Sequence, residues 1–113
     1  MKIVRDKIKL FELKNMAQDM FGNMVKAVID VERGLMAVDG ELHSDEEEAL
    51  LEDGSMQENL WGINIYPDKS GDDFIEFDSM INIKPSQNNR SRGIDDLKIR
   101  EKVIKIVNFL VQR

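Results

Sequence analysis

Residues 24–43, MVKAVIDVERGLMAVDGELH, decide the fold of this 113-residue chain. Apolar, mostly β-branched side chains recur at every second position of the stretch and so share one face of an extended segment: Val25, Ala27, Ile29 and Val31. Gly34 or the pair Asp39-Gly40 can then reverse the chain, and Asp-Gly is a strong hairpin signal. The stretch therefore predicts strand structure with an antiparallel hairpin.

Two later segments carry the same alternation. They are residues 59–67, NLWGINIYP, and residues 73–85, DFIEFDSMINIKP, and residues 66–73, YPDKSGDD, form the loop between them. Alternating apolar residues on both sides of a short polar loop predict a second antiparallel pair. Ile3, Val4 and Ile8 allow a short leading edge strand.

Helical periodicity marks three segments. The first begins at Leu10 and stops at Gly22-Asn23, and the second covers residues 44–54, where Ser44 and Glu47 have the spacing of a capping box. The third begins near Asp96, with Asp95 as the expected N-cap. The order is roughly (β)αββαββα, which predicts one α+β domain: a mostly antiparallel sheet with helices packed on one face.

The charge is distributed unevenly. Residues 39–78 hold one lysine against fourteen acidic residues, whereas residues 79–113 hold eight basic and three acidic residues. One interpretation is that the two regions neutralise each other within the fold or across a subunit interface, which favours a homodimer. The alternative is a basic surface for nucleic acid, and the acidic block would weaken such binding.

Composition narrows the class of protein further. The chain has no cysteine, which is compatible with a reducing cytoplasm. No apolar run is long enough to cross a membrane, and the first ten residues contain no uninterrupted apolar stretch typical of a secretory signal. We expect a cytoplasmic protein, and the sequence indicates no particular cofactor.

His43 is the only histidine. One hypothesis makes it a general acid or base at the mouth of a cleft, with its pKa raised by neighbouring carboxylates. The other makes it a partly buried side chain that donates to a backbone carbonyl or to Asp45. Asp39, Glu41 and His43 would share a face of an extended strand, but a turn at Asp39-Gly40 leaves only two of these groups, so we assign no metal site.

The loop PSQNNRSRGIDD, residues 85–96, carries two arginines immediately before the last helix. Arg90 and Arg92 can hold an anion with help from the backbone N–H groups at the helix start. Asp95 and Asp96 oppose this, because they would occupy or repel those same donors. The alternative partner for the arginines is the acidic region of the protein itself.

Two asparagines stand between isoleucines in two expected strands. Strands are poor in asparagine unless the amide has a partner, so Asn64 and Asn82 are candidate ligand-orienting groups. Glu76 and Asp78 alternate on an expected strand face, and such pairs are usually surface acids. Asp78 and Asp45 remain candidates to orient the imidazole of His43.

Three segments together resemble a small prokaryotic family known only as a domain of unknown function. They are GELHSDEEEALLEDGS at 40–55, LWGINIYP at 60–67 and FDSMINIKPSQNNRSRGI at 77–94, and the resemblance covers about residues 8–110. The positions that match the family pattern are Glu41, His43, Asp45, Trp61, Asn64, Tyr66, Asp78, Ser79, Asn82, Pro85, Ser86, Gln87, Asn89, Arg90, Ser91 and Arg92. The resemblance implies a shared site but names no activity, cofactor or catalytic residue.

Three functions follow as hypotheses. The first is a binding or interaction module whose arginine loop meets acidic groups or an anion. The second is a small enzyme acting on a phosphate or carboxylate substrate, with His43, Asp45 and Asp78 as its catalytic residues. In both, the expected ligand-binding residues are Arg90, Arg92, Ser86, Gln87, Asn89, Asn82 and Asn64. The third is a nucleic-acid binder or nuclease that uses Lys84, the two arginines and the stripe Lys98, Lys102 and Lys105.

Overall fold

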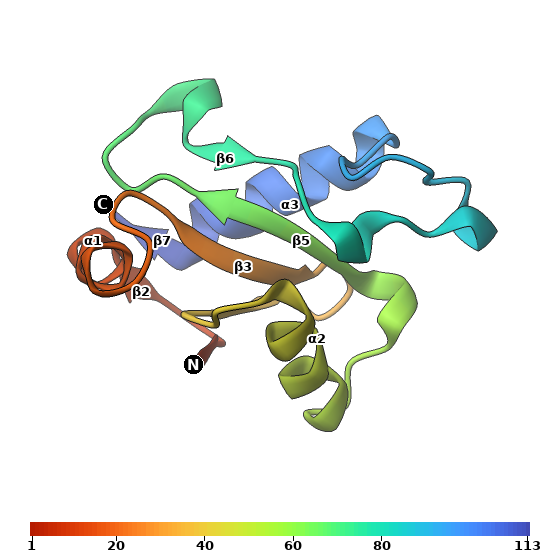
Figure 1. The fold of residues 1–113 in the computed structure, drawn as a ribbon, viewed down its shortest axis with the longest axis horizontal. Coiled ribbons are helices and arrows are strands. Elements are labelled where there is room, and N and C mark those ends of the chain that lie inside the picture. Colours follow the sequence, from red (N-terminus) through yellow and green to blue (C-terminus); the bar gives the residue numbers. More distant parts are fainter.

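A five-stranded antiparallel sheet forms the centre of the molecule in the computed structural model, which describes residues 1–113 (Figure 1). Its strand order is β1-β4-β3-β5-β6. The strands are β1 (Lys2–Val4), β4 (Leu35–Val38), β3 (Val25–Asp30), β5 (Leu60–Ile65) and β6 (Ile75–Glu76). The structure confirms the α+β class, the single domain and the leading edge strand.

Helices cover both faces of this sheet (Figure 1). α1 (Leu10–Asp19) and α3 (Leu97–Leu110) lie against one face, where the larger core cluster includes Leu13, Ala27 and Val107. α2 (His43–Glu52) lies against the other face, where Leu50 packs with Val28. The α2 helix is thus not on the expected common face. All four residues of β4 are apolar and buried, and Val28 of β3 is buried on the α2 side, so the sheet needs cover on both faces.

A short parallel pair joins the two ends of the chain. β2 (Ile8–Lys9) pairs with β7 (Val111–Gln112), which directly follows α3. Ile8 and Val111 are both buried in the larger core cluster. The pair therefore fixes the ends of α1 and α3 to each other beside the sheet.

The hairpin between β3 and β4 turns at Gly34, the first of the two positions that the sequence allowed. Gly34 adopts a positive φ of 68°, which glycine reaches without steric cost. Asp39 also has a positive φ, 67°, but it follows β4 and directs the chain toward α2.

None of the helices combines the length and the apolar composition that a membrane-spanning helix needs.

The expected strand at 73–85 is much shorter in the structure. Only Ile75–Glu76 pair with β5, and the chain then forms two 3-10 turns, Met80–Asn82 and Pro85–Gln87. The carboxamide of Asn82 accepts from the N–H of Gly62 (2.8 Å) and donates to its carbonyl (2.9 Å). A side chain thus takes the hydrogen bonds that a neighbouring strand would have made, and the alternation in the sequence did not reveal this.

Both expected helix caps are displaced. α2 begins at His43 after Leu42, so Ser44 lies inside the helix and makes no cap. Asp96, and not Asp95, caps α3 by accepting from the N–H of Lys98 (2.8 Å). Asp95 instead accepts from the hydroxyl of Ser91 (2.6 Å), which removes it from the helix start.

Candidate functional site: a polar cavity beside His43

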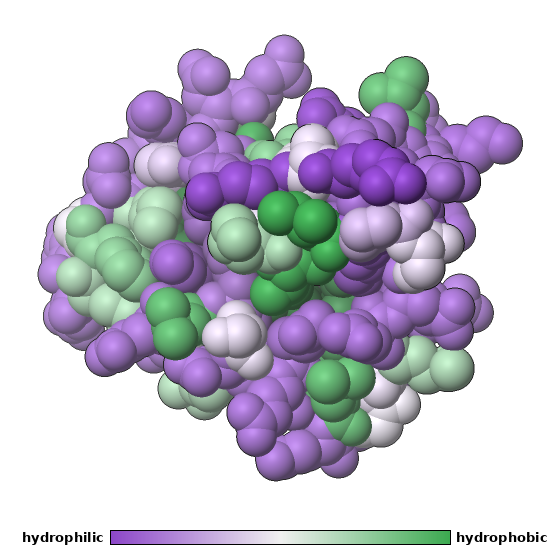
Figure 2. All heavy atoms as spheres, turned by 45° about the vertical axis from the view of Figure 1, so that its right-hand side comes forward, coloured by the Kyte–Doolittle hydropathy of each residue, from purple (hydrophilic) through white to green (hydrophobic).

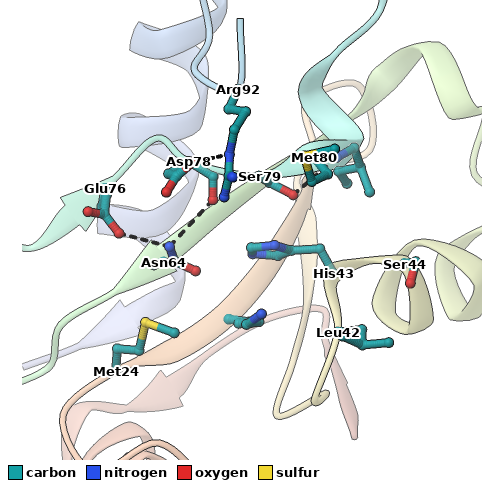
Figure 3. Close-up of a pocket in the computed structure, with 12 residues that line it drawn as sticks. Met24, Leu42, His43, Ser44, Asn64, Glu76, Asp78, Ser79, Met80 and Arg92 are labelled. Atoms are coloured by element: carbon teal, nitrogen blue, oxygen red, sulfur yellow. Dashed lines mark hydrogen bonds and ion pairs between the residues drawn. The ribbon is translucent and has the colours of Figure 1, made fainter.

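A cavity of about 420 Å³ opens on the sheet face that α2 covers (Figure 3). Its walls come from β3 and β5, from the first turn of α2, and from the segment that leaves the sheet after β6. The lining residues are Met24, Lys26, Leu42, His43, Ser44, Asn64, Glu76, Asp78, Ser79, Met80, Ile81 and Arg92. The cavity therefore brings together four of the ten residues expected at the site: His43, Asn64, Asp78 and Arg92.

His43, the first residue of α2, is only 8% exposed. Its Nε2 lies 2.7 Å from the carbonyl oxygen of Ile63, so Nε2 carries the proton and donates it. Nδ1 has no hydrogen-bond partner in the protein, and it is not sealed inside the structure. The alternative in which His43 donates to a backbone carbonyl is the one observed.

Burial lowers the pKa of His43 below its ordinary value of 6.5, although the bond to Ile63 opposes the change. The expectation of a raised pKa is therefore wrong. The loss of hydration outweighs the nearby carboxylate, since Asp78 raises this pKa only as a minor contribution and Lys26 lowers it. His43 is consequently a neutral imidazole at pH 7, with the Nδ1 lone pair available.

Lys26, Asn64 and Glu76 form a row across three strands. Lys26 on β3 is the cross-strand partner of Asn64 on β5, which is in turn the partner of Glu76 on β6. The amide nitrogen of Asn64 donates to Glu76 Oε1 (2.8 Å), and Tyr66 donates to the same oxygen (3.0 Å). Glu76 is therefore held by the protein, whereas the ammonium of Lys26 has no carboxylate partner.

Arg92 and Asp78 form an ion pair at the upper edge of the cavity in Figure 3. Arg92 Nε lies 2.7 Å from Asp78 Oδ1, and both side chains are about half exposed, 57% and 43%. Exposed pairs of this kind contribute about 0–1 kcal/mol to stability. The pair uses only Nε of Arg92, so the terminal N–H groups of the guanidinium have no partner in the protein.

Asn82 and Asn89 have structural positions and do not line the cavity. Besides its contacts with Gly62, Asn82 donates to the carbonyl of Arg92 (3.0 Å). Asn89 donates to the carbonyls of Asn82 (2.7 Å) and Gly93 (2.8 Å) and accepts from the N–H of Asp95. These two amides hold the backbone on which Arg92 stands.

Four other expected site residues lie outside the cavity. Ser86, Arg90 and Asp45 are exposed to solvent, and Arg90 makes no hydrogen bond or ion pair. Gln87 is also exposed and donates to the carbonyl of Glu58 (3.0 Å). The two arginines of the loop are thus separated: Arg92 reaches the cavity and Arg90 faces solvent.

The sequence reasoning missed Lys26 and set Glu76 aside as a surface acid. Both lie on the same sheet face as Asn64 because the register of β3, β5 and β6 aligns them. The alternation of side chains along a strand does place Lys26 on the face away from Val25 and Ala27, and the sequence alone could have shown this. The register itself was not available, because it depends on which residues pair across strands.

Asp39, Glu41 and His43 do not gather as a ligand set. Residues 40–42 lie outside strand structure, His43 is buried against β5, and Glu41 is exposed. No group of three or more histidine, aspartate or glutamate side chains in the structure is arranged to hold a metal ion.

The surface around the cavity combines apolar and strongly polar residues. Figure 2 shows hydrophobic residues gathered near the centre of this side of the molecule, beneath a band of strongly hydrophilic ones. At the cavity itself, Leu42 and Met80 are exposed lining residues, 54% and 64%. Fold and site together define a small α+β domain with one buried imidazole at the wall of a polar cavity.

A family model described as "Protein of unknown function (DUF5674)" matches residues 2–110. The chain belongs to this family. No curated protein and no solved structure matches the chain.

Proposed function

We propose that this protein binds a small anionic molecule in the cavity beside His43. The observation that carries the proposal is that Lys26, Arg92 and the first turn of α2 border one cavity. Both carboxylates of the cavity are engaged, Glu76 by Asn64 and Asp78 by Arg92, which leaves Lys26 as the unpaired charge. The first turn of a helix adds partial positive charge from its N–H groups.

The start of α2 is open to such a ligand. No side chain caps this helix, and Leu42, the N-cap residue, lines the cavity with His43 and Ser44. An anion there would receive hydrogen bonds from groups that the fold leaves without a side-chain acceptor. Arg92 would keep its Nε bond to Asp78 and bind the ligand through its terminal N–H groups, which make no other hydrogen bond in the structure.

The two arginines of the loop give a matched test. We expect Arg92→Met to weaken the binding of inorganic phosphate about tenfold, which corresponds to about 1.4 kcal/mol, close to the lower limit for one charge-assisted hydrogen bond. Lys26→Met should weaken binding similarly. Titration followed by ¹H–¹⁵N NMR spectra measures both the affinity and the position of the shifted resonances.

Arg90→Met is the control, because Arg90 carries the same charge two residues away and faces solvent outside the cavity. It should leave phosphate affinity within about twofold of wild type. Equal losses in Arg90→Met and Arg92→Met would show a general charge effect. That result, or phosphate shifts confined to other surfaces, contradicts a site in this cavity.

Acid–base catalysis by His43 is the second candidate function. It is favoured by the fixed tautomer, in which Nε2 donates to Ile63 and Nδ1 is free to take a proton from a bound substrate. A neutral imidazole is the form that acts as a base. Of the two aspartates expected to orient the imidazole, Asp45 lies outside the cavity, so only Asp78 could act beside His43.

The titration of His43 tests this role directly, since it is the only histidine and its NMR signals are unambiguous. We expect a pKa below 6.5 in the free protein, because burial disfavours the charged ring. Saturating phosphate should raise this pKa, because a nearby anion stabilises the imidazolium. An unchanged pKa in the presence of bound phosphate would place the anion away from His43 and remove the candidate.

Nucleic-acid binding receives less support from the geometry. Lys84, one of its expected contacts, is buried and donates to the carbonyls of Gln57 (2.8 Å) and Leu60 (2.6 Å). Arg92 is paired with Asp78. The basic residues proposed for this role thus do not all present free charge on the surface.

A further inference from the structure

Two acceptor atoms of the cavity residues lack a donor. The first is Oδ1 of Asn64, a residue only 6% exposed, and this oxygen is buried without a hydrogen-bond partner. Its orientation is fixed, because the amide nitrogen donates to Glu76 Oε1 (2.8 Å) and lies 3.4 Å from the carbonyl of Asp78. Figure 3 shows Oδ1 turned toward the His43 side of the cavity.

The second acceptor is Nδ1 of His43. The bond from Nε2 to Ile63 fixes the proton on the other nitrogen, so Nδ1 presents a lone pair whenever the ring is neutral. Burial favours that neutral form. Buried polar groups of proteins nearly always have partners, so the orphan Oδ1 of Asn64 is unusual, and Nδ1 of His43 adds an accessible acceptor at the same cavity.

We propose that the ligand of this cavity carries a hydrogen-bond donor as well as an anionic group. The ligand class is a small molecule that carries an amino or hydroxyl group together with a carboxylate or phosphate. Its amino or hydroxyl group is bound by Asn64 Oδ1 and His43 Nδ1, and its carboxylate or phosphate by Lys26 and Arg92. The inference rests on the proposed function, and it adds a hydrogen-bond donor to the anionic group of the ligand.

The size and charge of the cavity agree with this class. A volume of about 420 Å³ lies near the lower end of small-molecule sites. Lys26 is the cross-strand neighbour of Asn64, so the anion-binding and donor-binding groups are adjacent on the sheet. Because Asn64 Oδ1 is itself inaccessible to solvent, binding requires neighbouring side chains of the cavity to move and expose it.

Matched probes test the two groups separately. Propanoate supplies the carboxylate alone and ethylamine the donor alone, whereas alanine and lactate supply both. Ethyl phosphate and phosphoethanolamine make the corresponding phosphate pair. We expect one two-group probe to bind at least tenfold more tightly than its anion-only partner, with NMR shifts at Lys26, His43, Asn64 and Arg92.

Variants then locate the donor site. Asn64→Leu should abolish the tenfold preference, so that the two-group probe binds no more tightly than the anion-only probe, whereas Asn15→Leu, an exposed change on α1, should leave the preference unchanged. Should Asn64→Leu fail to fold, His43→Gln serves instead, because its amide can still donate to Ile63. Retention of the full preference in the folded variant overturns the inference.

The probes also separate this inference from the proposed function. Propanoate or ethyl phosphate binding in the cavity as tightly as the two-group probes overturns the inference and leaves anion binding intact. Failure of every anionic probe to shift the cavity resonances overturns both. Ethylamine binding as tightly as alanine would also overturn both, because the anionic group would then contribute nothing.

Discussion

Two buried ionisable side chains lie one helical turn apart on α2, and burial keeps both uncharged. It lowers the pKa of His43 and raises that of Glu46 to about 9. Glu46 is fully buried, and its Oε2 accepts from the N–H of Gly40 (2.9 Å) while Oε1 has no partner. A Cβ at Gly40 would lie 2.7 Å from Glu46 Cγ, so glycine is what allows this close contact.

Glu46 should make the folded protein less stable as the pH rises. Its pKa is 4.5 ordinarily and about 9 when folded, so between these values the unfolded chain releases a proton that the folded chain keeps. The contribution to stability is full below pH 4.5 and is lost as the pH rises toward 9. We expect Glu46→Gln, which cannot ionise, to be more stable than wild type by about 2–4 kcal/mol at pH 8.

Urea unfolding at pH 5, 6.5 and 8 measures this difference, which should grow with pH. Glu48→Gln is the matched control, because Glu48 is exposed on the same helix. Its stability relative to wild type should vary little over the same range. A Glu46→Gln difference that stays constant with pH would show that Glu46 is ionised in the folded state.

At the scale of elements, the periodicity of the sequence predicted the strands and helices that bury one apolar face against the core. The alternation of Val25, Ala27 and Ile29 predicted β3, and the helical spacing from Leu10 predicted α1, because these residues bury one face against the core. Residue type, and not periodicity, marked His43, Asn64 and other polar residues as candidates for the site. The prediction from periodicity failed where side chains replace backbone hydrogen bonds.

Asn82 is the clearest case of that failure. Its neighbours alternate as in a strand, yet its amide bonds both backbone groups of Gly62, and the chain there forms a 3-10 turn. Gly62 permits the close approach of Ser79 in the same segment, since a Cβ at Gly62 would meet Ser79 at 2.6 Å. A glycine inside a strand does indicate such contacts, but which residue approaches it depends on the tertiary structure.

This turn also explains why the cavity could not be read from the sequence. Because β6 ends at Glu76, the following residues leave the sheet and pass over the face of β5, where Ser79 and Ile81 lie near Gly62. Lys26 and Arg92 meet at one cavity only through this path and the strand register. Both are long-range features that composition and spacing do not encode.

At the scale of the whole molecule, the charge asymmetry of the sequence persists on the surface. Only one ion pair, Arg92 with Asp78, joins the basic C-terminal third to the acidic region. α2 presents exposed acids at Asp45, Glu48 and Glu52, and α3 presents exposed lysines at Lys98, Lys102 and Lys105. The two helices lie on opposite faces of the sheet (Figure 1). The basic C-terminal third and the acidic region therefore neutralise each other only to a limited extent within one chain.

Because α2 and α3 present opposite charges on opposite faces, copies of the protein should attract one another. We predict self-association through these two surfaces. The acidic α2 surface of one molecule would meet the basic α3 surface of the next, and 0.1 M salt would screen the attraction between charges more than about 10 Å apart. We expect the sedimentation coefficient to rise with protein concentration at low salt and to become constant at about 0.5 M salt. Lys98→Glu with Lys102→Glu should abolish the rise, whereas Lys14→Glu, a change on α1, should reduce it little. A monomer at every concentration in low salt contradicts this prediction, and a dimer that resists 0.5 M salt would indicate an apolar interface instead.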